Sequence, residues 1–173
     1  MIIFDNYNTE EQYTDNDIKE MAIDCEWIDN ADDITDSMIE EWRQEQIDIE
    51  WEAVKAELDN LFDNKTVMFV GTVGRWNGTY AGGKVGDFWD LFNKAMTDCW
   101  YLTLEDIKGH LYLTCSHHDG TNKFEIKVLT DKGKQYYENW EYSTDARTEQ
   151  DCHRQIAKRY SLLPRYAKTV YGV

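Results

Sequence analysis

The amino-acid sequence predicts an α+β fold in which acidic N-terminal helices pack on one small antiparallel sheet, with further helices at the C-terminal end. Two observations support this prediction. Residues 100–129 contain three runs of alternating apolar and polar side chains, separated by short segments of turn-forming residues. The segments on both sides of this stretch carry apolar residues at helical spacing, and such helices can cover the apolar face of a sheet.

Three strands are expected in the central stretch, at residues 100–105, 111–115 and 123–128. In each run every second side chain is apolar, so each strand presents one apolar and one polar face. The connecting segments 106–109 and 117–122 contain a glycine and an Asp-Gly pair, both of which favour tight reversals. The pattern therefore predicts an antiparallel meander.

Two helices are expected before this sheet. Thr14 has the chemistry of a helix N-cap, and the apolar spacing behind it predicts a helix over residues 15–28. Residues 30–33 break the pattern, and Ser37 with Glu40 forms a capping-box motif that predicts a second, longer helix. Its apolar stripe consists of Met38, Ile39, Trp42, Ile47, Trp51, Val54, Leu58 and Leu61.

The remaining elements follow from shorter patterns. Residues 66–70 read as a strand, residues 71–84 as a glycine-rich connection, and residues 87–98, 131–142 and 149–160 as helices. The connection matches a phosphate-binding loop except at its last position, where Val85 has no hydroxyl group for magnesium. Glycines that allow a wide turn are the preferred interpretation.

Composition indicates a folded protein of the cytosol. The chain has 173 residues, 42% of them hydrophobic and 14% aromatic, which argues against disorder despite a net charge of -16. No apolar run is long enough for a membrane helix, and the first residues lack the basic start of a signal peptide. Four cysteines without a close pair predict free thiols: Cys25, Cys99, Cys115 and Cys152.

The negative charge is concentrated in the N-terminal third. Residues 1–64 contain 21 Asp and Glu against 3 Lys and Arg, whereas residues 65–173 contain 13 acidic and 15 basic residues. We therefore expect an acidic helical region over 1–64 and an α+β core with basic C-terminal helices over 65–173. The basic tail could dock on the acidic helices or contact nucleic acid.

The acidic helix face has two interpretations. One is an ordinary solvated surface, and the other is mimicry of a nucleic-acid backbone, in which carboxylates occupy a cationic groove of a partner. Arg75 and Trp76 in the glycine-rich connection add a cation and a stacking surface, and Trp76 could anchor an interface. The predicted acidic contacts are Asp33, Asp36, Glu40, Glu41, Glu45 and Asp48.

A second constellation lies at residues 115–119, where a thiol, two imidazoles and a carboxylate occur together. Adjacent histidines at a strand end point to opposite faces, so a hydrogen-bonded turn is the preferred interpretation. The alternative is a metal-dependent hydrolase centred on His117, His118 and Asp119. No catalytic residue, metal or cofactor is predicted.

Several segments resemble small phage- and plasmid-borne proteins of Gram-positive bacteria, some of which are anti-CRISPR inhibitors of the RNA-guided type II Cas nuclease. The resemblance covers roughly residues 67–142 and rests on segments 70–78, 109–112, 115–122, 124–127 and 139–140. It implies a non-enzymatic inhibitor in the host bacterial cytoplasm that binds this nuclease, or another nucleic-acid-binding protein, and blocks DNA binding or cleavage.

A nucleic-acid-binding accessory protein of a mobile element, using Arg75, Trp76 and the basic tail, is the main alternative function. It would contact DNA directly, and its binding would be sensitive to salt. No contact with a membrane is expected, and both a monomer and a homodimer are compatible with the sequence.

Overall fold

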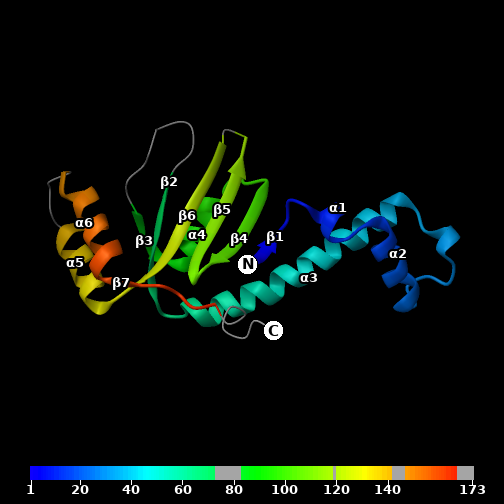
Figure 1. Ribbon diagram of the computed structural model, residues 1–173, viewed down its shortest axis with the longest axis horizontal. Helices are drawn as coiled ribbons and strands as arrows, with labels where there is room; N and C mark the ends of the chain where they lie inside the picture. Colours follow the sequence, from blue (N-terminus) through cyan, green and yellow to red (C-terminus); the bar gives the residue numbers. More distant parts are fainter. Residues whose placement is uncertain (73–82, 119, 142–146, 167–173) are drawn as a thin grey trace.

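The computed structural model describes residues 1–72, 83–118, 120–141 and 147–166. Its centre is a seven-stranded antiparallel sheet with helices packed on both faces, which confirms the predicted α+β class (Figure 1). Arg75, Trp76 and Asp119 lie outside the described residues, so the roles proposed for them stay predictions.

The strands follow the order β1-β4-β5-β6-β2-β3, and β7 pairs with β6. Strands β1 and β3 therefore form the two edges. The strand bounds are β1 (Ile2–Asp5), β2 (Thr66–Thr72), β3 (Gly83–Asp87), β4 (Tyr101–Ile107), β5 (His110–His117), β6 (Gly120–Leu129) and β7 (Ser161–Leu162). The helix bounds are α1 (Thr9–Gln12), α2 (Asp15–Asp24), η1 (Ala31–Asp33), α3 (Asp36–Phe62), α4 (Phe88–Met96), α5 (Asp131–Glu141) and α6 (Arg147–Arg159).

The predicted meander is confirmed as β4, β5 and β6. Leu113 pairs with Leu104 on one side and with Phe124 on the other, so the apolar faces of the three strands coincide. The turn between β4 and β5 has two central residues, Lys108 and Gly109, both with positive φ angles of 56° and 86°. This backbone matches the right-handed twist of the paired strands, and the glycine makes it accessible.

One face of the sheet is covered by α3 and α4, which form the main core. Phe62 of α3 stacks on Phe88 of α4 at 4.2 Å between ring centroids, and Phe88 also contacts Phe69 of β2. The stripe of α3 that faces the sheet agrees with the predicted spacing at Val54 and Leu58. Burial of these side chains is the main stabilising contribution to the fold.

The other face of the sheet is covered at the β2–β3 end by α5 and α6. Met68 and Leu129 form a second core there with Cys152 and Ile156 of α6. Helix α6 consequently lies at the opposite end of the molecule from α2 (Figure 1). The expectation that the basic tail could dock on the acidic helices is therefore wrong for its helical part, α6, whereas Tyr166 after α6 packs in the main core with α3.

Of the two N-terminal caps predicted from the sequence, the one at Thr14 is confirmed and the one at Ser37 is wrong. Thr14 caps α2 and forms a capping box with Asp17, as its chemistry predicted. Helix α2 ends at Asp24 rather than near residue 28, because Glu26 takes a positive φ of 56°. The N-cap of α3 is Thr35, whose hydroxyl accepts a 3.4 Å hydrogen bond from the Met38 N–H, so the capping box predicted at Ser37 is wrong.

Helix α3 spans 27 residues, which corresponds to about 40 Å. Its C-terminal half packs under the sheet, whereas its N-terminal half projects beyond the sheet together with α2 (Figure 1). We call residues 15–48, which include α2, η1 and this projecting half of α3, the acidic arm.

Candidate interaction surface

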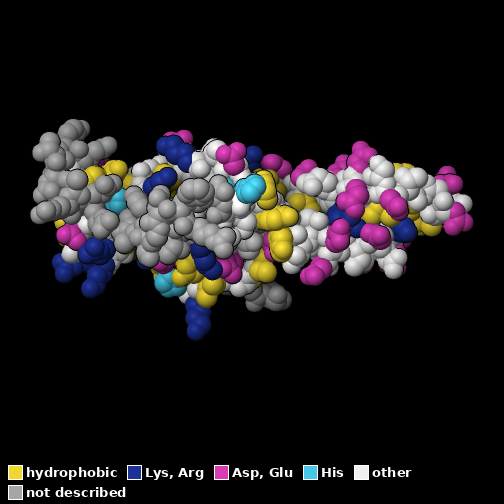
Figure 2. Space-filling model, turned by 90° about the horizontal axis from the view of Figure 1, so that it is seen from above, with side chains coloured by type: hydrophobic (Ala, Val, Ile, Leu, Met, Phe, Trp, Pro, Cys, Tyr) yellow, Lys and Arg dark blue, Asp and Glu magenta, His cyan; other side chains and the backbone are white. Residues whose placement is uncertain are grey.

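The acidic arm holds most of the protein's excess negative charge. Thirteen Asp and Glu residues lie between positions 15 and 48, against only two basic residues, Lys19 and Arg43. Figure 2 shows these carboxylates crowded at one end of the molecule, where few Lys or Arg side chains are visible. The charge asymmetry of the sequence therefore becomes a spatial separation of charge.

The structure places all six predicted acidic contacts on the surface of this arm. Asp33 ends η1, Asp36 is the first residue of α3, and the other four follow along α3. All six side chains are exposed. The predicted contacts Arg75 and Trp76 lie outside the described residues, so their position relative to the arm stays a prediction.

Arg43 is buried inside the arm and holds its two helices together. Its side chain is 3% exposed, and its Nε donates a 2.9 Å hydrogen bond to the Tyr13 carbonyl. One terminal nitrogen lies 2.5 Å from a Glu40 oxygen, and the other contacts Asp15 at the start of α2. Glu40 therefore has an internal ion-pairing role in addition to its exposure.

The sequence analysis did not identify Arg43 as a bridging residue, although its position along α3 indicates burial. Ile39 and Ile47 lie four residues before and after it, so it occupies the buried stripe of α3. A single cation at that position in an acidic helix predicts an internal bridge, since an unpaired charge there would be costly. With Arg43 neutralised, Lys19 is the one basic side chain left on the arm surface.

Four carboxylates form a stripe on the other face of α3. Glu41, Glu45, Asp48 and Glu52 follow at steps of four, three and four residues, and all are exposed. This spacing places them on one helix face, at intervals of roughly 4.5–6 Å along the axis. We call this row the carboxylate stripe.

An exposed aromatic patch lies beside the base of the arm, at the end of the sheet where β1 stops and β4 begins. Tyr7 is 58% exposed and contacts Tyr101, with ring centroids 4.5 Å apart. Trp100 is 59% exposed and lies against the His118 ring. Figure 2 shows hydrophobic side chains gathered between the body and the acidic end. Exposed aromatic side chains of this kind are common in protein interfaces.

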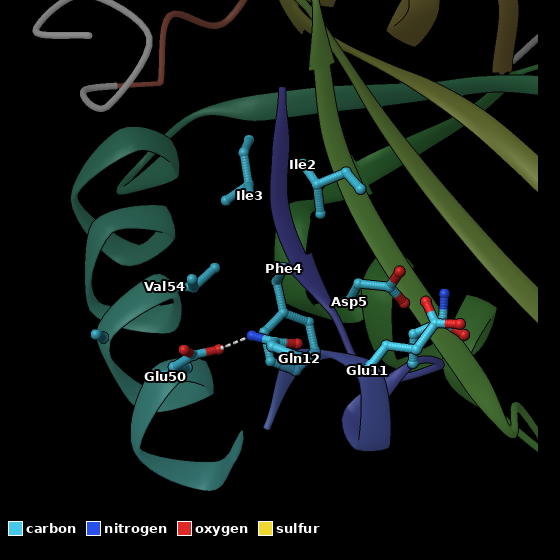
Figure 3. Close-up of a pocket in the computed structure, with 10 residues that line it drawn as sticks. Ile2, Ile3, Phe4, Asp5, Glu11, Gln12, Glu50 and Val54 are labelled. Atoms are coloured by element: carbon cyan, nitrogen blue, oxygen red, sulfur yellow. Dashed lines mark hydrogen bonds between the residues drawn. The ribbon is translucent and has the colours of Figure 1, made fainter. Parts of the chain in front are cut away.

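A pocket of about 520 Å³ lies between β1, α1 and α3. We call it the β1–α3 pocket. In Figure 3, Ile3 and Val54 lie in the gap between the strand and the helix, and Gln12 reaches across to Glu50. The lining residues are Ile2, Ile3, Phe4, Asp5, Asn8, Glu11, Gln12, Glu50, Ala53 and Val54. They include three carboxylates and no basic side chain.

Both carboxylate oxygens of Glu50 in this pocket accept a hydrogen bond. It accepts a 2.7 Å hydrogen bond from Gln12 Nε2 and a second hydrogen bond from the Tyr13 hydroxyl. Burial and this contact with the Glu50 carboxylate raise the pKa of Tyr13 to about 12. Tyr13 therefore remains a hydrogen-bond donor at neutral pH.

The two adjacent histidines, His117 and His118, lie in different surroundings, as their position at the end of a strand predicts. His117 is partly buried, with Nε2 shielded from solvent, whereas His118 is exposed and its ring lies 5.4 Å from that of Trp100. Asp119 lies outside the described residues. Among the residues that the structure describes, no three His, Cys, Asp or Glu side chains converge as a metal site would require.

The fold and these surfaces define an α+β protein with a projecting acidic arm. No protein-family model, curated protein or solved structure matches this chain. In the described part of the chain no helix has the length and apolar character needed to cross a membrane.

Proposed function

We propose that the protein is a non-enzymatic inhibitor that binds the cationic, nucleic-acid-binding surface of a partner protein through its acidic arm. The supporting observation is the arm itself, where thirteen carboxylates stand against two basic side chains, one of which, Arg43, is buried and paired with Asp15 and Glu40. A surface of this charge attracts a cationic groove and repels phosphate. The same charge makes direct nucleic-acid binding by the arm unfavourable.

The shape of the arm supports occupation of a groove. The N-terminal half of α3 extends beyond the sheet (Figure 1), and all four side chains of the carboxylate stripe are exposed. The aromatic patch at its base adds apolar area to a surface that would otherwise contribute mainly charge. The arm and the patch together suit a partner protein better than free DNA.

The resemblance in residues 67–142 makes the type II Cas nuclease the first partner to test. The protein would occupy the positively charged channel that holds the nucleic acid and would prevent DNA binding or cleavage. The alternative of a DNA-binding accessory protein relies on Arg75, Trp76 and the basic α6, whose exposed Lys158 and Arg159 lie far from the arm.

A DNA cleavage assay with a purified type II Cas nuclease and guide RNA tests this proposal. The protein is added before or after the target DNA, at about 50 mM and 200 mM salt, a range over which charge-based binding weakens strongly. We expect inhibition when the protein is added first, with weaker inhibition at high salt. Absence of both inhibition and a complex on a sizing column would reject the nuclease as the partner.

A matched pair of variants isolates the contribution of the arm. The triple change Glu41→Lys, Glu45→Lys and Asp48→Lys should raise the inhibitor concentration needed for half inhibition at least tenfold. The control makes the same charge change on the body, at the exposed residues Asp90, Glu138 and Asp151. Equal losses in both variants would indicate that net charge alone, rather than the arm, is responsible.

A further inference from the structure

We infer that two copies of this protein associate head to tail, with the acidic arm of one copy docked on a basic surface of the other. That surface is formed by the start of α5, the end of α6 and β7, and we call it the α5–α6 surface. It consists of Lys132, Lys134, Tyr136, Lys158, Arg159 and Leu162. The inference uses the arm of the proposed function, but it does not depend on the nuclease.

The start of α5 and the end of α6 are held together at this surface. The N–H and the hydroxyl of Thr130 both donate hydrogen bonds to the Tyr160 carbonyl, at 2.8 Å and 2.9 Å. The two backbones approach so closely that a Cβ atom at Gly133 would lie 2.5 Å from the same carbonyl oxygen. The two lysines beside Gly133 and the two cations before Tyr160 therefore lie at the same end of this helix pair.

The four cations of the α5–α6 surface form no ion pair with any residue in the described part of the chain. Three of them are exposed, and Lys134 is partly exposed. Two carboxylates, Asp131 and Glu138, lie on the same segments, so the surface keeps an excess of positive charge. Arg154, one turn earlier on α6, is by contrast paired with Asp151 at 3.0 Å.

Exposed apolar side chains lie among these cations. Tyr136 is 40% exposed, and its ring lies 5.5 Å from the ring of Tyr160. Leu162 on β7 is 60% exposed. Protein interfaces combine apolar area with charge in this way. The α5–α6 surface therefore suits a protein partner better than a phosphate backbone, which would match only the charge.

The acidic arm supplies the complementary surface. The carboxylate stripe presents four exposed side chains along one helix face, and the exposed Tyr7 and Trp100 of the aromatic patch lie beside the base of the arm. The arm and α6 lie at opposite ends of the molecule (Figure 1), and Figure 2 shows acidic side chains crowded at one end and Lys and Arg side chains at the other. Contact between the two surfaces therefore requires a second copy.

The net charge of -16 does not prevent this contact at moderate salt. Helix α3 alone is about 40 Å long, whereas charges are screened over roughly 8 Å at physiological ionic strength. An arm that approaches the α5–α6 surface of another copy therefore responds mainly to the cations there. Because the two surfaces differ, the contact is heterologous, and a pair of chains retains one free arm and one free α5–α6 surface for further copies.

Analytical ultracentrifugation of the full-length protein tests the inference. At about 0.1 M salt the average sedimentation coefficient should rise with protein concentration over roughly 10 to 500 μM, and at about 0.5 M salt it should return to the monomer value. The arm variant carries Glu41→Gln, Glu45→Gln and Asp48→Asn, and the basic-surface variant carries Lys132→Gln, Lys158→Gln and Arg159→Gln. Each variant alone should self-associate roughly tenfold more weakly than the wild type.

A mixture of the two variants provides the sharpest result. The basic-surface variant keeps an intact arm, and the arm variant keeps an intact α5–α6 surface. An equimolar mixture should therefore form a complex of two chains and no larger species. A control variant carries Lys65→Gln, Lys94→Gln and Lys108→Gln, which remove the same charge at exposed positions elsewhere. It should associate as the wild type does.

A wild type that stays monomeric over this concentration range at the lower salt, or a mixture that does not associate, would overturn the inference. Equal weakening in the control variant would do the same, because it would assign the association to net charge. Binding of a fluorescent single-stranded oligonucleotide of about 15 nucleotides, lost in the basic-surface variant and without self-association, would assign the α5–α6 surface to nucleic acid instead. None of these results involves the nuclease, so the proposed function is tested separately.

Discussion

Arg43 carries a positive charge into the interior of the acidic arm, where one guanidinium serves three acceptors. It contacts the Tyr13 carbonyl, Glu40 and Asp15, and so joins α3 to the start of α2 and to the segment before it. Hydrogen bonds to charged groups are stronger than neutral ones, and a buried carbonyl without its donor is costly. The geometry of the arm therefore depends on this side chain.

Replacing Arg43 by methionine keeps the apolar stem but removes all three contacts. We expect the free energy of unfolding, measured by urea denaturation, to fall by about 2 kcal/mol. Lys55→Met is a suitable control, because Lys55 lies on the same helix in a partly exposed pair with Glu52 at 3.5 Å. Its loss should be about 0.5 kcal/mol or less. Equal losses in the two variants would contradict an internal bridging role for Arg43.

Glu125 on β6 is a partly buried carboxylate whose titration is linked to folding. Burial alone would raise its pKa, but hydrogen bonds from His110 at 2.6 Å and from Lys127 at 3.2 Å outweigh burial and lower it. A carboxylate with a depressed folded-state pKa stabilises the fold above its unfolded value of 4.5. That contribution disappears as the pH falls through the lower folded-state pKa.

The stability difference between the wild type and Glu125→Gln should therefore depend on pH. The wild type should be the more stable protein at pH 6.5, and the difference should shrink when unfolding is measured in urea at pH 3. Thr121→Ser on the same strand, which changes no charge, should show no such trend. A difference that grows on acidification would show that the depressed pKa of Glu125 does not contribute to stability.

At the scale of elements, α3 combines two tasks that favour different residues. Its C-terminal half needs apolar residues against the sheet, and the pattern around Val54 and Leu58 provides them. Its N-terminal half carries three of the four members of the carboxylate stripe, which are neighbours at i,i+3 and i,i+4 and repel each other. The arm therefore retains charge that reduces helix stability, as expected for a surface kept for binding.

Neutralising the stripe should reveal this cost. The triple variant Glu41→Gln, Glu45→Gln and Asp48→Asn should be more stable than the wild type by about 1 kcal/mol, because three like-charge contacts are removed. Thermal unfolding at low salt measures the gain. Raising the salt to about 0.5 M should reduce the gain by screening the same repulsion in the wild type. A destabilised variant would instead indicate that these carboxylates make favourable contacts.

Two edge strands illustrate the limits of local patterns. Strand β3 lies within Gly83–Asp87, where two glycines and a lysine hide the alternation, and its pairing with β2 is the main sign that it is a strand. Strand β1 has four residues and pairs with β4 roughly 100 positions further along the chain. Neither is long or regular enough to be recognised without its partner, because β structure depends on cross-strand contacts.

At the scale of the whole molecule, the arm and the body differ in how they are held. The main core includes Ile47, Val54, Leu58 and Phe62 of α3 but not Ile39, which is buried in the arm apart from that core. The C-terminal half of α3 therefore packs in the main core, whereas its N-terminal half is held by contacts within the arm. Regions with few buried contacts open more often than the core.

Hydrogen exchange measured by mass spectrometry should show this difference along α3. Amides of residues 39–47 should exchange at least tenfold faster than those of residues 54–62, although both belong to one continuous helix. The Arg43→Met variant should increase the contrast, because it weakens the attachment of α2 to α3. Uniform protection along α3 would show that the arm and the body open as a single unit.

The sequence by itself determined the α+β class, the meander, the long helix and the concentration of acid in the first third of the chain. These features depend on periodicity, turn residues and composition, which are local properties. The predicted acidic contacts were likewise found on the surface, since charged residues opposite an apolar stripe must face water.

Only the tertiary structure decided where these parts lie relative to one another. It separated the acidic arm from the basic α6, buried Arg43, exposed Trp100 and formed the β1–α3 pocket from residues far apart in the chain. The physical reason is that burial and charge–charge contact are properties of three-dimensional neighbours. A pattern within one segment specifies which face is apolar, but not which other segment will cover it.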